Sequence, residues 1–269
     1  MNFGIIGGTG MEMLFSQISS SAEAKSIETP YGGPVNYLSF DYQGHKIFFL
    51  DRHNNSGRFL LPHQLNRQAY MYVLGQICHC DAILASSAVG AIRLGNWFKV
   101  GDLVIPTEAI NYVQEAYTFA NYSNSSPIFH RPLDYPFCPH LCEALRGEDS
   151  MPVMRFVLAN SITGPAFETR WQMKIRVRDG VHLVGMPTAY PEAVLAGELS
   201  IPYGLVCGVS NFAPATDDGS TVTEVMTNLV PQMAKCLFGA VNFLIQKGNH
   251  DSQCPCRKGR GHSVFAIPS

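Results

Sequence analysis

The stretch from residue 164 to residue 211 constrains the fold more than any other part of the sequence. It contains apolar runs at 181–186 and 203–209, with a helix-like segment at 192–199 between them. A buried strand, a helix and a second buried strand in succession predict a β-α-β unit whose strands lie parallel in one sheet. Ligands usually bind beyond the carboxyl ends of such strands. Three candidate residues fall at this predicted edge: Met186, Thr188 and Asn211.

Other apolar runs extend the pattern over most of the chain. Runs at 36–40 and 46–50 flank a polar segment and predict a β-hairpin. Further strands are predicted at 3–6, 82–86, 101–106 and 153–161. A polar segment with little periodicity at 114–139 predicts a long loop, and loops of that length usually carry function or make contacts.

Helical spacing is clearest in two segments. The first begins at Pro62, and its apolar positions recur every four residues: Leu65, Ala69, Val73 and Ile77. This spacing predicts that one face packs on the sheet. The second begins at Thr221, which forms a capping-box pattern with Glu224 before a long amphipathic run. Shorter helices are predicted at 138–147, 169–178 and 192–199.

Length and composition favour one domain. The 269 residues are 46% hydrophobic, which is enough for a single large core, and no change in composition marks a boundary. We therefore expect one α/β domain over residues 1–248, with a mixed, largely parallel β-sheet flanked by helices. Residues 249–269 are polar and rich in glycine and charge, so they are expected to form a disordered tail.

Charge and hydropathy exclude several classes of function. The formal net charge is −2, so the chain lacks the basic field of a nucleic-acid-binding protein, and a small anion must be held by a few local residues. No run reaches the roughly 18 apolar residues needed for a membrane span. The start of the chain, an apolar strand and a glycine loop, is unlike a secretory signal. We expect a cytoplasmic protein that binds neither nucleic acid nor membrane.

The eight cysteines are expected to be reduced and mainly structural, because a chain of this size does not need disulfides. The run Cys78-His79-Cys80 lacks a second pair of ligands at zinc-site spacing. In the tail, Cys254 and Cys256 could form a redox-active pair, but without an activating surround they are expected to be inert and exposed.

Three segments are candidates for binding an anion. Residues 3–10, FGIIGGTG, run from a strand into a glycine turn that carries Thr9, although they match neither a dinucleotide fingerprint nor a P-loop. Arg52 and His53 end a strand, where a guanidinium and an imidazole could donate to phosphate. The small residues 87–90 are expected to form a turn whose amides and hydroxyl face the same anion. Taken singly, each segment could instead be an ordinary turn or an exposed pair.

The order of these motifs is more specific than any one of them. GIIGGTG, TPYG, a strand ending in RH, PHQLN, SSAVG, HRPLDYPFCP, GPAFET and VGM followed by PEAVLA appear in succession over about residues 3–245. In this order they resemble the purine nucleoside phosphorylase and methylthioadenosine phosphorylase family, in particular its trimeric members, including the methylthioinosine phosphorylases. The resemblance implies phosphorolysis of the N-glycosidic bond of a purine nucleoside. Inorganic phosphate is then the co-substrate, and no metal or organic cofactor is needed.

The resemblance also assigns roles to individual residues. It places the phosphate near six residues: Thr9, Arg52, His53, Ser87, the Ala88 amide and, in a lengthened turn, Thr188. Phe167 would stack on the purine while Glu168 accepts a ring N–H, and Met186 would lie beneath the ribose. His130 matches a histidine that a neighbouring subunit lends to the site, which implies a homotrimer.

The purine-facing pair predicts the class of base. Asn211 can donate to O6 and accept from N7–H, and Glu168 favours a base protonated on N1. Both features point to a 6-oxopurine nucleoside, with inosine, guanosine and 5′-methylthioinosine as candidates. The alternatives are a 5′-methylthioadenosine phosphorylase and a purine-binding homologue with weak or no catalysis.

Some positions depart from the family pattern. Gly57 replaces an expected histidine, and the segment from Met186 to Glu192 is one residue longer than usual, with Pro187 where a hydroxyl is often found. Gln172 and Gly197 replace a carboxylate and an arginine. These changes indicate either a different ribose 5′ substituent or reduced turnover.

Overall fold

A ten-stranded mixed sheet forms the centre of the computed structural model, which describes residues 1–8, 10–11, 22–55, 58–119, 132–147, 156–214, 220–247, 254 and 256. Eight strands follow one another in the order β2 (Glu23–Ile27), β3 (Val35–Tyr42), β4 (His45–Asp51), β1 (Asn2–Gly7), β7 (Ala82–Ile92), β11 (Leu183–Gly185), β10 (Val157–Asn160) and β9 (Glu108–Asn111). Strand β12 (Tyr203–Ala213) pairs with β7 and with β8 (Leu103–Val104). Two short strands, β5 (Asn54–Asn55) and β6 (Arg58–Phe59), pair separately.

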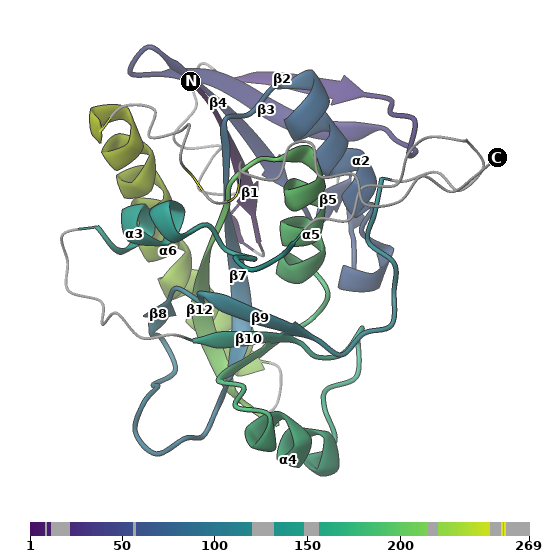
Figure 1. Cartoon of the computed structure of the whole chain (residues 1–269), viewed down its shortest axis with the longest axis vertical. Helices are drawn as coiled ribbons and strands as arrows, with labels where there is room; N and C mark the ends of the chain where they lie inside the picture. The colour runs from purple at the N-terminus through teal and green to yellow at the C-terminus, as the bar shows by residue number, and fades with distance from the viewer. Residues whose placement is uncertain are drawn as a thin grey trace.

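Strand β7 joins two halves of this sheet. Along its whole length it pairs with β12, which runs parallel to it. On its other side it pairs first with β1, up to Ala85, and then with β11, from Gly90 onward. Between these two residues, the described strands supply no partner on that side. Figure 1 shows the result, with β1–β4 near one end of β7 and β9 and β10 near the other.

Helices cover both faces of the central strands (Figure 1). Helices α3 (Pro139–Arg146) and α6 (Ser220–Lys247) pack on one face of β12, where Gly204 touches α3 and Gly208 touches α6. Helices α2 (Arg67–Tyr72) and α5 (Ala189–Leu199) pack together on the other face, which Tyr203 reaches from β12. Alternate residues of one strand thus contact different helix layers. Helix α4 (Arg170–Arg178) lies at the end near β10 (Figure 1).

The core explains the amphipathic patterns. Helix α6 buries residues at three- and four-residue spacing: Met226, Leu229, Val230, Met233, Leu237, Ala240, Val241 and Leu244. These side chains face β12 and α3. The side chain of Thr221 lies outside the described residues, so its capping box with Glu224 stays a prediction. Among the described residues, no helix combines the length and hydropathy that a bilayer crossing requires.

Most predicted elements are confirmed, with shifted ends. The hairpin at 36–40 and 46–50 is β3 and β4, which turn tightly at Gln43 and Gly44. The helix predicted at 192–199 starts three residues earlier, at Ala189, and the strand predicted at 101–106 is reduced to β8. The strand at 203–209 continues to Ala213, because β7 pairs with it throughout.

Three structural predictions are wrong. The two strands of the β-α-β unit expected over 181–209 are not parallel, because β11 runs antiparallel to β7 whereas β12 runs parallel to it. The segment 87–90 is not a turn, because its ladder with β12 keeps it extended as part of β7. The helix expected from Pro62 opens with a short 3-10 turn (Pro62–Gln64), becomes α2 only at Arg67 and continues as a π-helix (Val73–Ile77). This change of helical pitch moves Ile77 off the buried face, so its side chain is 41% exposed.

Candidate active site

A cavity of about 230 Å³ opens where β1 and β11 part along β7. Its walls come from distant parts of the chain: Gly8, Arg52, His53, Phe59, Pro62, Ser87, Ala88, Val89, Gly90, Ile162, Phe167, Glu168, Val184, Gly185, Met186, Thr188, Ser210, Asn211, Ala213 and Val222. Nine of the eleven residues predicted for the site therefore line one cavity. The other two, Thr9 and His130, lie outside the described residues.

The backbone of β7 supplies hydrogen-bonding groups to one wall of the cavity. The N–H of Ile83 faces β12 and the carbonyl of Ser86 faces Arg52, so alternate residues of β7 turn their amides toward opposite sides. By this alternation Ala88 directs its N–H into the unpaired side. The predicted amide donor at Ala88 is thus a consequence of strand geometry.

The first strand must approach this wall closely. The N–H of Gly8 donates to Oγ of Ser86 at 3.0 Å. A Cβ at Gly8 would lie 2.9 Å from the Ser86 carbonyl oxygen and 3.2 Å from Nη1 of Arg52. Only glycine leaves room for both contacts, which explains the glycine turn after β1.

A β-bulge in β12 aims Asn211 at the cavity. Val209 is level with Val89 and Asn211 with Gly90, so Ser210 is the extra residue. Oγ of Ser210 lies 3.2 Å from the Val89 carbonyl oxygen and donates to Oδ1 of Asn211 at 2.8 Å, while Nδ2 of Asn211 donates to the Phe212 carbonyl at 3.1 Å. These bonds fix the amide and leave one N–H and one oxygen lone pair for a ligand.

Phe167 and Glu168 lie just before α4. Thr169 caps this helix by accepting from the Gln172 amide, and Gln172 accepts from the Thr169 amide in return. Gln172, the departure noted above, therefore completes a capping box that fixes the preceding backbone. The Phe167 ring is 51% exposed, whereas Glu168 is only 7% exposed. Among the described residues, the Glu168 carboxylate has no hydrogen-bond or ion-pair partner.

Met186 forms another part of the wall, directly after β11. Its sulfur would lie 2.7 Å from a Cβ at Gly164, a residue with φ of 75°. Both the close approach and the left-handed backbone require glycine at that position. Gly164 thus lets Met186 lie against the segment that leads to Phe167.

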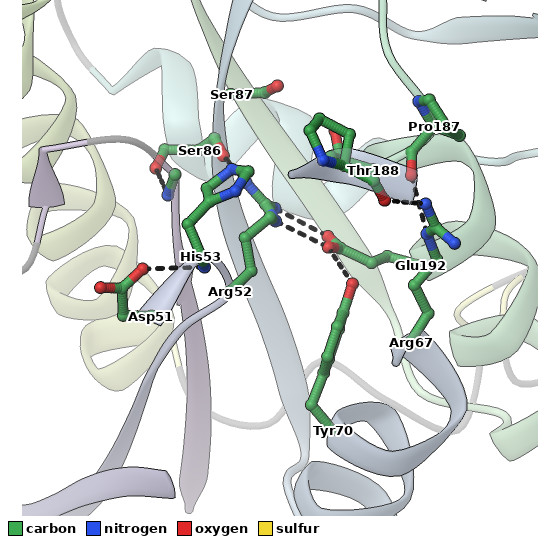
Figure 2. Close-up of polar contacts among 12 residues, drawn as sticks. Asp51, Arg52, His53, Arg67, Tyr70, Ser86, Ser87, Pro187, Thr188 and Glu192 are labelled. Atoms are coloured by element: carbon green, nitrogen blue, oxygen red, sulfur yellow. Dashed lines mark hydrogen bonds and ion pairs between the residues drawn. The ribbon is translucent and has the colours of Figure 1, made fainter. Parts of the chain in front are cut away.

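Arg52 is buried in an ionic network rather than exposed as an isolated pair (Figure 2). Its Nε and Nη2 donate to the two carboxylate oxygens of Glu192 at 2.8 and 2.9 Å, and its Nη1 donates to the Ser86 carbonyl at 2.6 Å. The hydroxyls of Tyr70 and Tyr203 each donate to Glu192 at 2.6 Å. Burial disfavours the Arg52 charge, but the adjacent Glu192 carboxylate outweighs it and raises the arginine pKa.

The imidazole of His53, next to this network, is neutral. Burial and the neighbouring Arg52 charge lower its pKa to about 4. Its Nδ1 lies 2.9 Å from the Leu60 carbonyl oxygen and must carry the proton to make that bond. Its Nε2 therefore carries no proton at neutral pH in the ligand-free chain, and the role of His53 toward an anion stays a prediction. The Phe59 ring stacks on the imidazole with centroids 5.0 Å apart.

Thr188 lines the cavity in the lengthened turn before α5. It precedes the first turn of that helix, where backbone amides favour an anion. Its Oγ1 lies 3.4 Å from the Met186 carbonyl oxygen. Nε of Arg67 donates to the Pro187 carbonyl at 2.7 Å and holds the turn in place (Figure 2). Ser87, whose hydroxyl lies 3.3 Å from the Ala88 carbonyl oxygen, adds a further hydroxyl to the wall.

Sequence reasoning missed the residues that support this wall. Arg67, Tyr70, Glu192 and Tyr203 hold the Arg52 side or the Pro187 turn, and Ser210 makes the bulge. A carboxylate in an apolar helix, as at Glu192, signals a buried partner, but 140 residues separate it from Arg52. The spacing of the sequence alone does not reveal that pairing.

The prediction of an exposed cysteine tail is wrong at the described positions. Cys254 is only 2% exposed and its sulfur lies 3.5 Å from that of Cys138, which is 1% exposed. Cys256 is half-buried. All eight cysteines fall in the described part of the chain, where none forms a disulfide.

Comparisons with known proteins agree with this geometry. The family model described as the phosphorylase superfamily matches residues 2–242. A probable 6-oxopurine nucleoside phosphorylase of Dictyoglomus turgidum is 34% identical, with 96% of this chain and 95% of the relative covered. A probable S-methyl-5′-thioinosine phosphorylase of Methanopyrus kandleri is 30% identical, over 94% of this chain and 95% of the relative.

The fold has known structural relatives as well. The crystal structure of a methylthioadenosine phosphorylase from an antarctic soil metagenomic library superimposes with a TM-score of 0.81, covers 98% of this chain and 92% of its own, and is 24% identical. The predicted α/β fold and the resemblance read from the motif order are confirmed. The chain is an enzyme of the phosphorylase superfamily.

Proposed function

We propose that the chain catalyses phosphorolysis of a 6-oxopurine nucleoside. A phosphate oxygen bonds to C1′ of the ribose while the bond from C1′ to N9 breaks. The bonding electrons stay on the purine, which takes up a proton, and the products are a free base and a ribose 1-phosphate. The enzyme must hold phosphate on one side of the ribose and stabilise the departing base on the other.

The observation that carries the proposal is the buried Glu168 carboxylate at the cavity wall, without a partner among the described residues. A carboxylate that opens into the cavity can accept a hydrogen bond there, and N1–H of hypoxanthine or guanine supplies the donor, whereas adenine has no proton on N1. The open N–H of Asn211 can donate to O6 and its oxygen can accept from N7–H. Phe167, exposed beside them, provides a ring for stacking.

The other cavity wall supports a phosphate site made mainly of neutral donors. Glu192 balances the charge of Arg52, and His53 is neutral, so these three residues together carry no net charge. The amide of Ala88, the hydroxyls of Ser87 and Thr188 and the first turn of α5 then contribute most of the attraction. We propose that phosphate binds here with the help of Thr9, and that Met186 lies beneath the ribose.

Apolar side chains favour a methylthio group on the ribose 5′ carbon. Phe59, Pro62 and Val222 line the cavity, and Phe59 stacks on His53, next to Arg52. These side chains offer no hydrogen bond to a 5′ hydroxyl, so we propose 5′-methylthioinosine as a substrate beside inosine. 5′-Methylthioadenosine remains an alternative, which the Glu168 and Asn211 pair disfavours.

The test compares four nucleosides with and without phosphate: inosine, 5′-methylthioinosine, adenosine and 5′-methylthioadenosine. Release of hypoxanthine that depends on phosphate is the expected result. Release of adenine alone would refute the 6-oxopurine assignment. Tight calorimetric binding of hypoxanthine without turnover of any nucleoside would identify a purine-binding homologue.

A homotrimer and a cytoplasmic location complete the proposal. The family resemblance implies that His130 of a neighbouring subunit closes the site, and the exposed Phe167 leaves a side of the cavity that a neighbour could cover. Sedimentation equilibrium measures the assembly. His130→Ala should raise the nucleoside KM without changing the sedimenting mass; a trimer with unchanged KM would remove His130 from the site.

A further inference from the structure

Three cysteines that are distant in the sequence meet outside the nucleoside cavity. The sulfurs of Cys138, Cys254 and Cys256 all lie within 4.8 Å of one another. Cys138 precedes α3, and the other two come from a segment 116 and more residues later in the chain. None of the three lines the cavity that holds Arg52 and Asn211. Their meeting therefore needs an explanation apart from phosphorolysis.

The spacing of the sulfurs suits a metal ion. Ligands of a tetrahedral zinc ion with Zn–S bonds of about 2.3 Å lie about 3.8 Å apart. The sulfurs of Cys138 and Cys254 are 3.5 Å apart, close to that value. A disulfide would use only two of the three sulfurs and leave the third as a buried or half-buried thiol. A single thiophilic ion uses all three.

The place of Cys138 at a helix end suits a thiolate, the form that binds metals. Cys138 is the N-cap residue of the eight-residue helix α3, and its side chain makes no capping bond, so its sulfur lies at the positive end of the helix dipole.

The surround also fixes the ligands in place. The Cys138 amide donates to the Tyr203 carbonyl at 2.8 Å, and the Cys138 carbonyl accepts from the Cys142 amide at 2.9 Å. Cys138 and Cys254 are almost fully buried, whereas the half-buried Cys256 gives an ion a route from solvent. Rigid support of this kind is typical of structural metal sites.

We propose that Cys138, Cys254 and Cys256 bind one Zn²⁺ ion as a structural site. Three sulfur–zinc bonds form, the thiol protons pass to solvent, and no electron is transferred. The fourth tetrahedral position is left to a solvent molecule on the side of Cys256. The ion would attach Cys254 and Cys256 to α3 and to the start of β12, so its effect is on stability rather than on the chemical step.

Cobalt and zinc titrations of the full chain test the site. Protein stripped of metal and kept reduced is titrated with Co²⁺, whose thiolate charge-transfer bands report sulfur ligation, and Zn²⁺ is then added as competitor. The expected result is one equivalent per chain, displacement of Co²⁺ by Zn²⁺ and a higher melting temperature with Zn²⁺.

Matched variants locate the ligands. Cys256→Ser, at a half-buried position that should tolerate the change, is expected to weaken Zn²⁺ binding at least tenfold and to abolish the increase in melting temperature. Cys236→Ser is the control, because Cys236 is also half-buried but only donates to the Leu145 carbonyl at 2.8 Å, which serine can do. Both variants should fold.

Three results would overturn the site. The first is a lack of charge-transfer bands in the reduced wild-type protein. The second is equal Zn²⁺ affinity of Cys256→Ser and Cys236→Ser. The third is a disulfide between any two of the three cysteines, found by mass spectrometry in protein alkylated at cell lysis.

Discussion

Two carboxylates on opposite sides of the nucleoside cavity differ in their hydrogen-bond partners. Glu192, beside the proposed phosphate site, is fully buried and its oxygens accept from Arg52, Tyr70 and Tyr203. Glu168, at the proposed base site, is nearly as buried but has no partner among the described residues. Glu192 therefore contributes to the stability of the fold, whereas Glu168 is available to bind a ligand.

Removing Glu192 should have the largest effect. Glu192→Ala leaves the Arg52 charge buried and unpaired, so we expect the free energy of unfolding to fall by about 3–5 kcal/mol. Urea denaturation followed by circular dichroism measures the loss. Asp41→Asn is the matched control, since it breaks the exposed Lys46–Asp41 pair of 2.9 Å and should cost less than about 1 kcal/mol. Equal losses in the two variants would show that the buried network has no special role.

Glu168→Gln should give the opposite signature. It replaces the charged acceptor for N1–H by a neutral amide of the same size, which stabilises the departing base less, so kcat/KM for inosine should fall about 100- to 1000-fold. The free energy of unfolding should change by less than about 1 kcal/mol, because no contact within the described residues is lost. Steady-state kinetics and urea denaturation of one preparation test both parts. Glu143→Gln, on the exposed face of α3, is the control for both.

His53 links the anion-binding wall to pH. Its pKa is about 4 in the folded chain against an ordinary value near 6.5, because burial and Arg52 disfavour its charge. The stability that this difference contributes is present above about pH 6.5 and is lost as pH falls toward 4, by about 2–3 kcal/mol. Unfolding measured between these values should show the decline, and His53→Gln should reduce its slope. An unchanged slope in the variant would assign the decline to other groups.

Asn211→Asp should have the smallest effect and the most specific one. A carboxylate cannot donate to O6 but can accept from the amine of adenine, so the ratio of kcat/KM for inosine over adenosine should fall about tenfold. The bulge bonds limit how far the side chain can move, because Ser210 donates to the same oxygen position. Unchanged selectivity would place Asn211 away from the base.

The sequence predicts which segments form strands and helices better than it predicts how the strands pair. Apolar runs and helical spacing identify strands and helices because burial alone dictates them. The extension of β7 through 87–90 is different, since small residues have little strand preference and only pairing with β12 keeps them extended. The extra residue Ser210 is likewise invisible to periodicity, because a bulge is defined by the opposite strand.

In the candidate site, too, some residues could be predicted from the sequence and others could not. Residues that face the cavity carry recognisable motifs, so Phe167, Glu168 and Arg52 could be identified from the sequence. Their supports could not, because Glu192 pairs with Arg52 across 140 residues and Cys254 meets Cys138 across 116. Such pairings become predictable only when the sheet order is known.

The gap along β7 also bears on how the site can change over evolutionary time. The amide that Ala88 turns toward the gap belongs to the main chain, so no substitution other than proline removes it. Side chains around the cavity can be exchanged, and substrate preference with them, while this donor is inherited unchanged. An insertion or deletion between Ala85 and Gly90 would instead rotate the strand by one residue and turn the donor toward β12. Selection must therefore preserve the alternation of backbone amides along this strand more than the identities of its residues.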